Sequence, residues 1–220
     1  GVGISADLSA NKSAFSVNLS NPAINDSKFN GDIEAHNTDA EISKTVYDLD
    51  KNTKGFSVGV GREILRNLRG GLRYKLDFLK EEYEYDSTFT KVSGTTYYDD
   101  IEYISSSLTP YLSFDNTDNY QLPREGIKAG TSLEYAGVGG DSKYLKSSTY
   151  FKYFNSLNDY AELDWIFRFR TKVSVLVDNG QINQGDSLYL GGVKSLRGYA
   201  SYAFPSNIDG EVIEPSKRSW

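Results

Sequence analysis

The chain has 220 residues, a formal net charge of −6 and no cysteine. Without cysteine it can form neither a disulfide scaffold nor a thiolate metal site. An acidic pI near 4.9 and scattered Lys and Arg argue against a nucleic-acid partner. The sequence contains no apolar run of the roughly 18 residues that a membrane-spanning helix needs. A membrane β-barrel is not excluded by this composition. Only alternate residues of its strands face lipid, so a mean hydropathy of −0.51 is compatible with a barrel.

Apolar and polar residues alternate in successive segments along the chain. A period of two is the pattern of a β-strand with one apolar face. In chain order it predicts strands at about 2–8, 15–20, 29–36, 56–60, 72–78, 100–115, 126–136 and 143–155. No segment has a convincing helical pattern.

The clearest alternation covers residues 160–178 and predicts a ninth strand. Strands of soluble proteins have a modal length of about 5 to 6 residues, whereas a tilted membrane-spanning strand needs about 9 to 11. The length of this strand therefore favours a membrane location. We expect its apolar face to meet lipid through Leu163, Trp165, Phe167, Phe169, Val173 and Val175.

The links between the predicted strands fall into two sets. Alternate links at 21–28, 63–68, 115–126 and 155–159 are fairly short. The other set holds longer polar links at 38–53, 85–99 and from 179 onward, together with short ones at 11 and 137–142. Short turns on one side and long loops on the other are typical of outer-membrane barrels.

One link carries a distinct pattern, Asp115-x-x-Asp118-x-x-x-x-Pro123-x-x-Gly126. Asp bonds nearby backbone, Pro fixes φ and Gly supplies positive φ, so these residues predict a structured turn. A calcium loop needs a closer alternation of oxygen ligands and usually a bidentate Glu. We therefore expect no metal here.

The candidates for catalysis are few. His36 is the only histidine and falls among Asp32 and Glu34 on the polar face of a predicted strand, so we expect a polar lumen or surface residue. Gly59 and Gly61 precede no helix and lack phosphate-loop spacing.

Acidic residues flank the predicted loop at 85–99, and we expect them to be solvated. They are Glu81, Glu82, Glu84, Asp86, Asp99, Asp100 and Glu102. The sequence predicts no catalytic residue, no cofactor and no metal.

The last part of the chain contains Gly191-Gly192 followed by Leu196-Arg197-Gly198-Tyr199. Together with the Asp115 to Gly126 link, this motif resembles the barrel of BamA-type outer-membrane assembly factors in the bacterial surface antigen family. The resemblance implies an all-β, antiparallel transmembrane β-barrel. The chain would supply about nine strands, the third to the eleventh, of a probable sixteen.

The resemblance also implies how the segments divide within one domain. Residues 1–178 would form barrel strands and their links, with the link at 115–126 as a periplasmic turn. Residues 179–220 would form a long extracellular loop folding into the lumen, where acidic groups of the wall hold Arg197. In the family these acids lie on strands after the loop. The chain begins at Gly1 without an initiating Met, which indicates a processed or excised piece; POTRA domains and the other strands would lie outside it.

By resemblance, the protein would fold and insert β-barrel proteins into the bacterial outer membrane. Its partners would be outer-membrane lipid, unfolded β-barrel clients and accessory lipoproteins. A TamA-like factor or a two-partner secretion translocator shares the same motifs and is an alternative function. A passive porin or a soluble β-sandwich is the alternative from another class.

Overall fold

The computed structural model describes residues 1–9, 12–43, 47–85, 99–157, 165–181, 188 and 218–219. These residues form one antiparallel sheet in which every strand pairs with its neighbour in sequence. The strands are β1 (Val2–Ser9), β2 (Lys12–Asn21), β3 (Phe29–Ser43), β4 (Tyr47–Leu65), β5 (Leu68–Tyr85), β6 (Ile101–Asp115), β7 (Gly126–Ala136), β8 (Lys143–Ser156), β9 (Ile166–Gln181) and the short β10 (Arg218–Ser219). A short 3-10 helix, η1, covers Ile24–Asp26. Among the described residues, no helix is long and apolar enough to cross a membrane.

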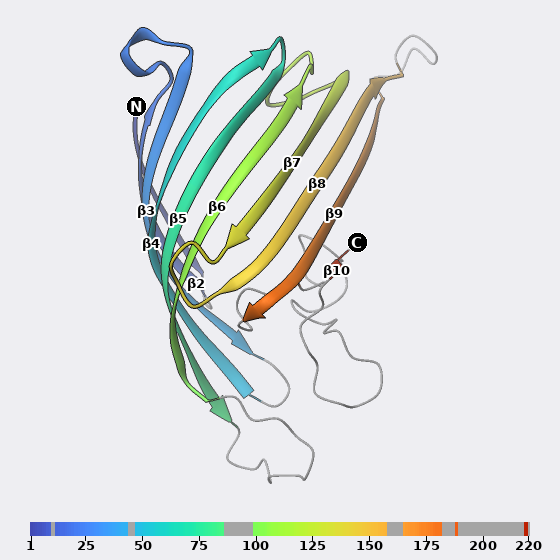
Figure 1. Cartoon of the computed structure of the whole chain (residues 1–220). Coiled ribbons are helices and arrows are strands. Elements are labelled where there is room, and N and C mark those ends of the chain that lie inside the picture. Colours follow the sequence, from blue (N-terminus) through green and yellow to red (C-terminus); the bar gives the residue numbers. More distant parts are fainter. Residues whose placement is uncertain are drawn as a thin grey trace.

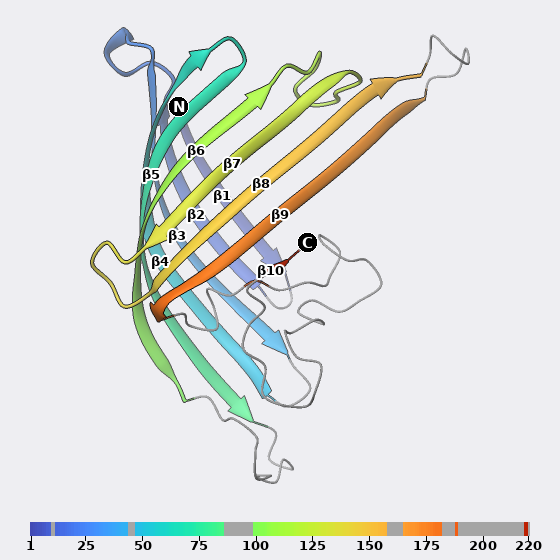
Figure 2. The same cartoon turned by 45° about the vertical axis from the view of Figure 1, so that its right-hand side comes forward.

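The sheet curves into a trough with β1 and β9 on opposite sides of its opening (Figures 1 and 2). The predicted all-β, antiparallel class is confirmed, and the described strands do not close into a complete barrel. We call the end with connectors 22–28, 66–67 and 116–125 the turn end; it lies at the top of Figure 1. The opposite end, with the connector 137–142, is the loop end.

The predicted long link at 38–53 is wrong, because strands occupy most of it. β3 continues to Ser43 and β4 starts at Tyr47, and the two pair as far as Ser43 with Asp48. On the way, the Asn52 side chain donates a hydrogen bond to Asp39. Polarity misled the prediction, since backbone pairing continues where both faces of a strand are polar. Only residues 44–46 separate β3 from β4 at the loop end, whereas residues 116–125 separate β6 from β7 at the turn end. The two ends therefore do not divide into short turns and long loops as predicted.

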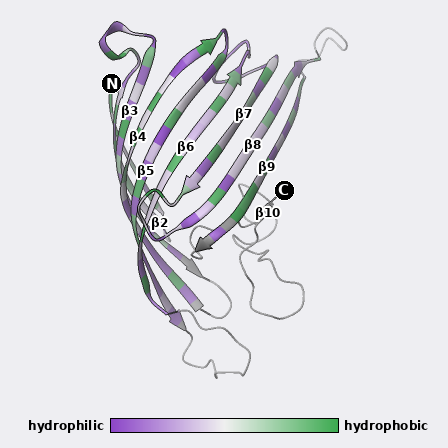
Figure 3. Ribbon diagram, in the orientation of Figure 1, coloured by the Kyte–Doolittle hydropathy of each residue, from purple (hydrophilic) through white to green (hydrophobic). Residues whose placement is uncertain are grey.

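The two faces of the sheet have opposite chemistry, and Figure 3 shows hydrophobic and hydrophilic residues alternating along the strands. The outer face exposes large apolar side chains on every long strand, for example Ile4, Phe15, Ile33, Val58, Phe78, Leu112, Leu133, Tyr153 and Phe169. The inner, concave face buries polar groups such as Ser57, Asp77, Glu81, Ser105 and Ser174. A soluble protein has the reverse arrangement, with unpaired charges kept outside. The pattern is that of a sheet with an apolar environment around it and a polar interior.

Glycines let aromatic rings lie flat against the inner face. A Cβ on Gly71 would stand 2.5 Å from the Tyr111 hydroxyl, and one on Gly61 2.7 Å from it. Gly61 and Gly71 are cross-strand partners, and Tyr111 pairs with Gly71 on the next strand. Gly130 makes the same room for the ring of Tyr150. These glycines serve packing, because a side chain at any of them would meet the ring.

Candidate functional site

The connector 116–125, bounded by Asp115 and Gly126, is a turn held by carboxylate and amide side chains. Asp118 Oδ1 accepts the backbone amides of Arg124 at 2.9 Å and Glu125 at 3.1 Å. Asp115 Oδ1 accepts both the hydroxyl and the amide of Thr117. Pro123 has no amide hydrogen, so the capped amides are those of the two residues that follow it. The side chains of the motif therefore form the structured turn that the sequence predicted.

Further contacts close the connector onto the sheet. Asn116 Oδ1 accepts the Ile127 amide at 2.7 Å, and the Lys128 amine lies 3.1 Å from Asp115 Oδ2. Gly126 has φ of 108°, and a Cβ there would stand 2.8 Å from the Thr117 Cα. Only glycine adopts this conformation at so close an approach without strain.

The Asp118 carboxylate is stabilised in its charged form. The amides of Glu125 and Arg124 donate to it and hold the pKa of Asp118 below its ordinary value. Its oxygens thus serve backbone amides. No group of three or more His, Cys, Asp or Glu side chains in the described ranges is arranged to hold a metal ion.

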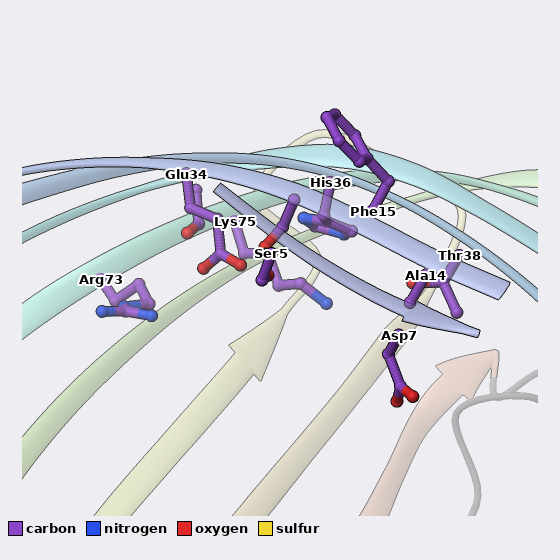
Figure 4. A pocket seen from close by; sticks show the side chains of 11 residues that line it. Ser5, Asp7, Ala14, Phe15, Glu34, His36, Thr38, Arg73 and Lys75 are labelled. Atoms are coloured by element: carbon purple, nitrogen blue, oxygen red, sulfur yellow. Dashed lines mark hydrogen bonds between the residues drawn. The ribbon is translucent and has the colours of Figure 1, made fainter. Parts of the chain in front are cut away.

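On the inner face of β3 to β5, charged side chains pair across strands. Arg73 donates to Asp32 at 2.8 Å, and Asp77, 5% exposed, lies between the Lys75 amine and His36 Nε2, the latter at 3.2 Å. His36, Arg73 and Lys75 line a polar cavity of about 320 Å³. Figure 4 shows Glu34 and Arg73 on the concave side of the strands and Phe15 on the opposite side. His36 therefore belongs to a network of polar and charged side chains on the inner face of the sheet.

The expectation that the acids around 85–99 are all solvated is wrong for Glu81. Its side chain faces inward and is 0% exposed. It accepts the hydroxyls of Tyr83 at 2.9 Å and Tyr103 at 2.8 Å, and the Lys51 amine lies 3.8 Å away. The three partners come from β4, β5 and β6. Lys51 and Tyr103 are far from Glu81 in the sequence, so their contact with it could not be predicted from the sequence. Asp86 lies outside the described residues.

The structure describes most of the side chains expected to face lipid. Trp165 just precedes β9 and is 61% exposed; Phe167, Phe169, Val173 and Val175 project from the outer face of β9 and are also exposed. Leu163 lies outside the described residues. Phe169 and Phe151 of β8 lie with ring centroids 6.4 Å apart.

The motif residues of the predicted lumen loop also lie outside the described part of the chain. They are Gly191, Gly192, Leu196, Arg197, Gly198 and Tyr199. Of the segment 179–220 the structure describes residues 179–181, which end β9, then Leu188, and Arg218–Ser219, which form β10. Leu188 packs in a buried cluster with Ala136, Tyr144 and Leu176. Ala136 and Tyr144 are cross-strand partners, and the cluster lies on the inner face.

A row of cations on the inner face was missed by the sequence prediction. Lys128, Lys152 and Arg170 are directly opposite one another on β7, β8 and β9. Alternation along a single strand signals a polar face but does not say which residues of neighbouring strands meet. Only the register of three strands reveals this row.

Comparisons with known proteins agree with this architecture. A sequence model of the Omp85 superfamily domain matches residues 1–213. Outer membrane protein assembly factor BamA of Nitratidesulfovibrio vulgaris is 29% identical over 203 residues, which are 90% of this chain and 24% of that protein. A SAM50-like protein of Schizosaccharomyces pombe is 25% identical over 195 residues, covering 86% of this chain and 40% of that protein.

The fold is also similar to a solved structure. The crystal structure of BamA from Haemophilus ducreyi lacking POTRA domains 1–3 superposes with a TM-score of 0.76 at 19% identity, covering 93% of this chain and 41% of that one. At that identity the likeness concerns the fold. This chain thus spans less than half the length of each of these proteins.

Proposed function

We propose, from the fact that this chain belongs to the Omp85 superfamily, that it is part of the barrel of a BamA-type assembly factor. Such a factor folds and inserts β-barrel proteins into the bacterial outer membrane. The observation that carries the proposal is the curved sheet with exposed apolar side chains outside and buried charged side chains inside. A sheet of this kind is stable with lipid on one face and water or protein on the other.

The action proposed needs no covalent chemistry and no nucleotide. Its physical basis is a weak strand seam in the full barrel that offers edge hydrogen bonds to an incoming strand, together with local thinning of the bilayer. Unpaired strand edges readily accept further strands. The described part of the chain contributes the wall of this barrel, and its paired charges and buried Glu81 stiffen that wall.

Apart from the residues that end β9 and form β10, the segment 179–220 is proposed to fold into the lumen, with the guanidinium of Arg197 held by carboxylates on the later strands of the full barrel. Bidentate carboxylate contacts fix both the charge and the orientation of an arginine. The packing of Leu188 against the inner face supports this position for the segment. The turn end, with Asp115 and Asp118, is proposed to face the periplasm.

The partners proposed are outer-membrane lipid, unfolded β-barrel clients and accessory lipoproteins. A TamA-like factor or a two-partner secretion translocator would share this wall, and no particular contact here favours either. A soluble β-sandwich needs two packed sheets, whereas the described strands form one.

Spin labels test the membrane placement. In the full-length protein reconstituted in lipid, a label at position 169 should be accessible to oxygen and one at position 170 to a water-soluble nickel reagent, because Phe169 faces outward and Arg170 inward. Equal accessibility of both labels to water would contradict the placement.

An insertion assay tests the function. Proteoliposomes with the full-length protein should accelerate the folding of a urea-unfolded client barrel, followed by its heat-modifiable gel migration. Liposomes with an unrelated closed barrel are the control. Equal folding rates in the two preparations would refute an assembly function.

A further inference from the structure

Six cations lie on the inner face of β7 to β9. One of them, Lys146, is the cross-strand partner of Glu134. We call the other five the cationic face: Lys128, Lys152, Arg168, Arg170 and Lys172. Lys128 faces Lys152, and Lys152 faces Arg170, as direct cross-strand partners. Arg168 and Lys172 flank Arg170 two residues away on the same face of β9. The outer face of the same strands is apolar, with Phe151, Tyr153 and Phe169 in ring contacts.

Like charges directly opposite each other destabilise a sheet, and here little offsets them. Lys128 pairs with Asp115 at 3.1 Å. The Lys152 amine lies 5.6 Å from the centroid of the Tyr150 ring. Within the part of the chain that the structure describes, Lys152, Arg168, Arg170 and Lys172 form no ion pair.

The inner face of β3 to β5 shows the contrast. There Arg73 pairs with Asp32, Lys75 with Asp77 and Lys51 with Glu81. The whole chain has more acids than bases, with a net charge of −6. The uncompensated positive charge of the wall is therefore concentrated at β7 to β9 and does not reflect the general composition.

We propose that the cationic face is a docking surface for an acidic polypeptide segment in extended conformation. Arg168, Arg170 and Lys172 recur every second residue, so their side chains project about 6.8 Å apart along β9. An extended segment with Asp or Glu at every second position has the same spacing. Laid along β9, it brings one carboxylate to each cation, while Lys152 meets it from the neighbouring strand.

The position of the face favours a polypeptide over a lipid head group as the source of negative charge. These side chains lie on the concave side, whereas the apolar outer face is the one suited to lipid. Next to Lys128 and Lys152 the wall is hollowed by a cavity of about 730 Å³, also lined by Arg69, Tyr120 and Tyr150 and by the carboxylates of Glu63 and Asp115, of which Asp115 pairs with Lys128. This leaves room for a chain to enter from the turn end.

The inference goes beyond the proposed function, because it names a partner chemistry for a surface that assembly activity does not define. Its test needs no client insertion, so the two fail separately. The probe is a fluorescein-labelled peptide of alternating Glu and Ser, titrated with the full-length protein in phosphatidylcholine nanodiscs at low salt and read by fluorescence anisotropy. The uncharged control peptide has Gln in place of Glu.

The variant Lys152→Gln/Arg170→Gln/Lys172→Gln removes the centre of the face. It should weaken peptide binding by about tenfold, the size expected when several exposed ion pairs are lost together. The matched control Lys54→Gln/Arg62→Gln/Lys80→Gln removes the same charge from the outer face and should leave the affinity unchanged. The charge-preserving variant Lys152→Arg/Arg170→Lys/Lys172→Arg should retain binding, and gel migration verifies that each variant is folded.

Three results would overturn the proposal. One is failure of the native protein to prefer the Glu peptide over the Gln peptide. Another is an equal loss of affinity in the inner and outer triple variants. The third is displacement of the peptide by glycerol phosphate at the same total charge, which would assign the face to the phosphate of a lipid head group.

Discussion

Arg73 donates a hydrogen bond to Asp32 at 2.8 Å although their strands, β5 and β3, are not neighbours. Gly59 of β4 is the cross-strand partner of both residues. With no side chain on the strand between them, the guanidinium and the carboxylate meet across it. A Cβ at Gly59 would stand 2.6 Å from Asp32 Oδ1.

Gly59→Val should therefore break this ion pair. The crowding is expected to lower the free energy of unfolding by about 1 to 3 kcal/mol, measured by urea unfolding of the full-length protein in lipid. Gly3→Val is the matched control, since a Cβ at Gly3 on the same face meets no atom within 4 Å. Equal stability of the two variants would argue against the role given to Gly59.

Tyr103→Phe removes one hydroxyl from the buried Glu81 carboxylate. Tyr103 is 4% exposed and its hydroxyl lies 2.8 Å from Glu81 Oε1, so the acid loses a donor that water cannot easily replace. We expect a loss of about 1 to 3 kcal/mol in the free energy of unfolding. Tyr153→Phe, on the exposed outer face, should change it little. If both variants unfold at the same urea concentration, Glu81 does not depend on this bond.

Asp118 should make stability depend on pH in a defined direction. Its folded-state pKa is lowered by the amides of Glu125 and Arg124, so its contribution is present above the ordinary value of 3.8 and lost as pH falls through the folded pKa. Asp118→Asn keeps an oxygen acceptor but not the charge. The variant should be less stable than the native protein at neutral pH, and the difference should vanish in acid. A difference that stays constant between pH 7 and pH 3 would exclude this explanation.

Arg197→Ala, made in the full-length protein, should destabilise the proposed lumen loop and weaken client insertion. The reason is the loss of a guanidinium that wall carboxylates would hold. Barrel melting and client folding in proteoliposomes are the two measurements, and Lys194→Ala is a control in the same segment. An unchanged melting profile together with normal insertion would count against this assignment.

Alternation along single strands was enough to predict the all-β class, nine strands and the apolar outer face of β9. The connector 116–125 was also predictable, because Asp118 caps amides only a few residues away and Gly126 is required by local geometry. The extent of β3 and β4 was not predicted, because their polar ends at 38–43 and 47–53 were interpreted as part of a loop. There the backbone ladder, which no side-chain pattern reports, holds the strands together.

Interactions between residues close together in the chain could be predicted from the sequence. Whether Glu81 is solvated or buried, whether Arg73 reaches Asp32, and that Lys128, Lys152 and Arg170 form one row depended on the folded sheet. The alternation of apolar and polar residues and the capping of nearby amides involve only a few neighbouring residues, so the sequence alone determines them. Contacts across strands depend on register and on glycines in the strand between, and these exist only once the strands have paired.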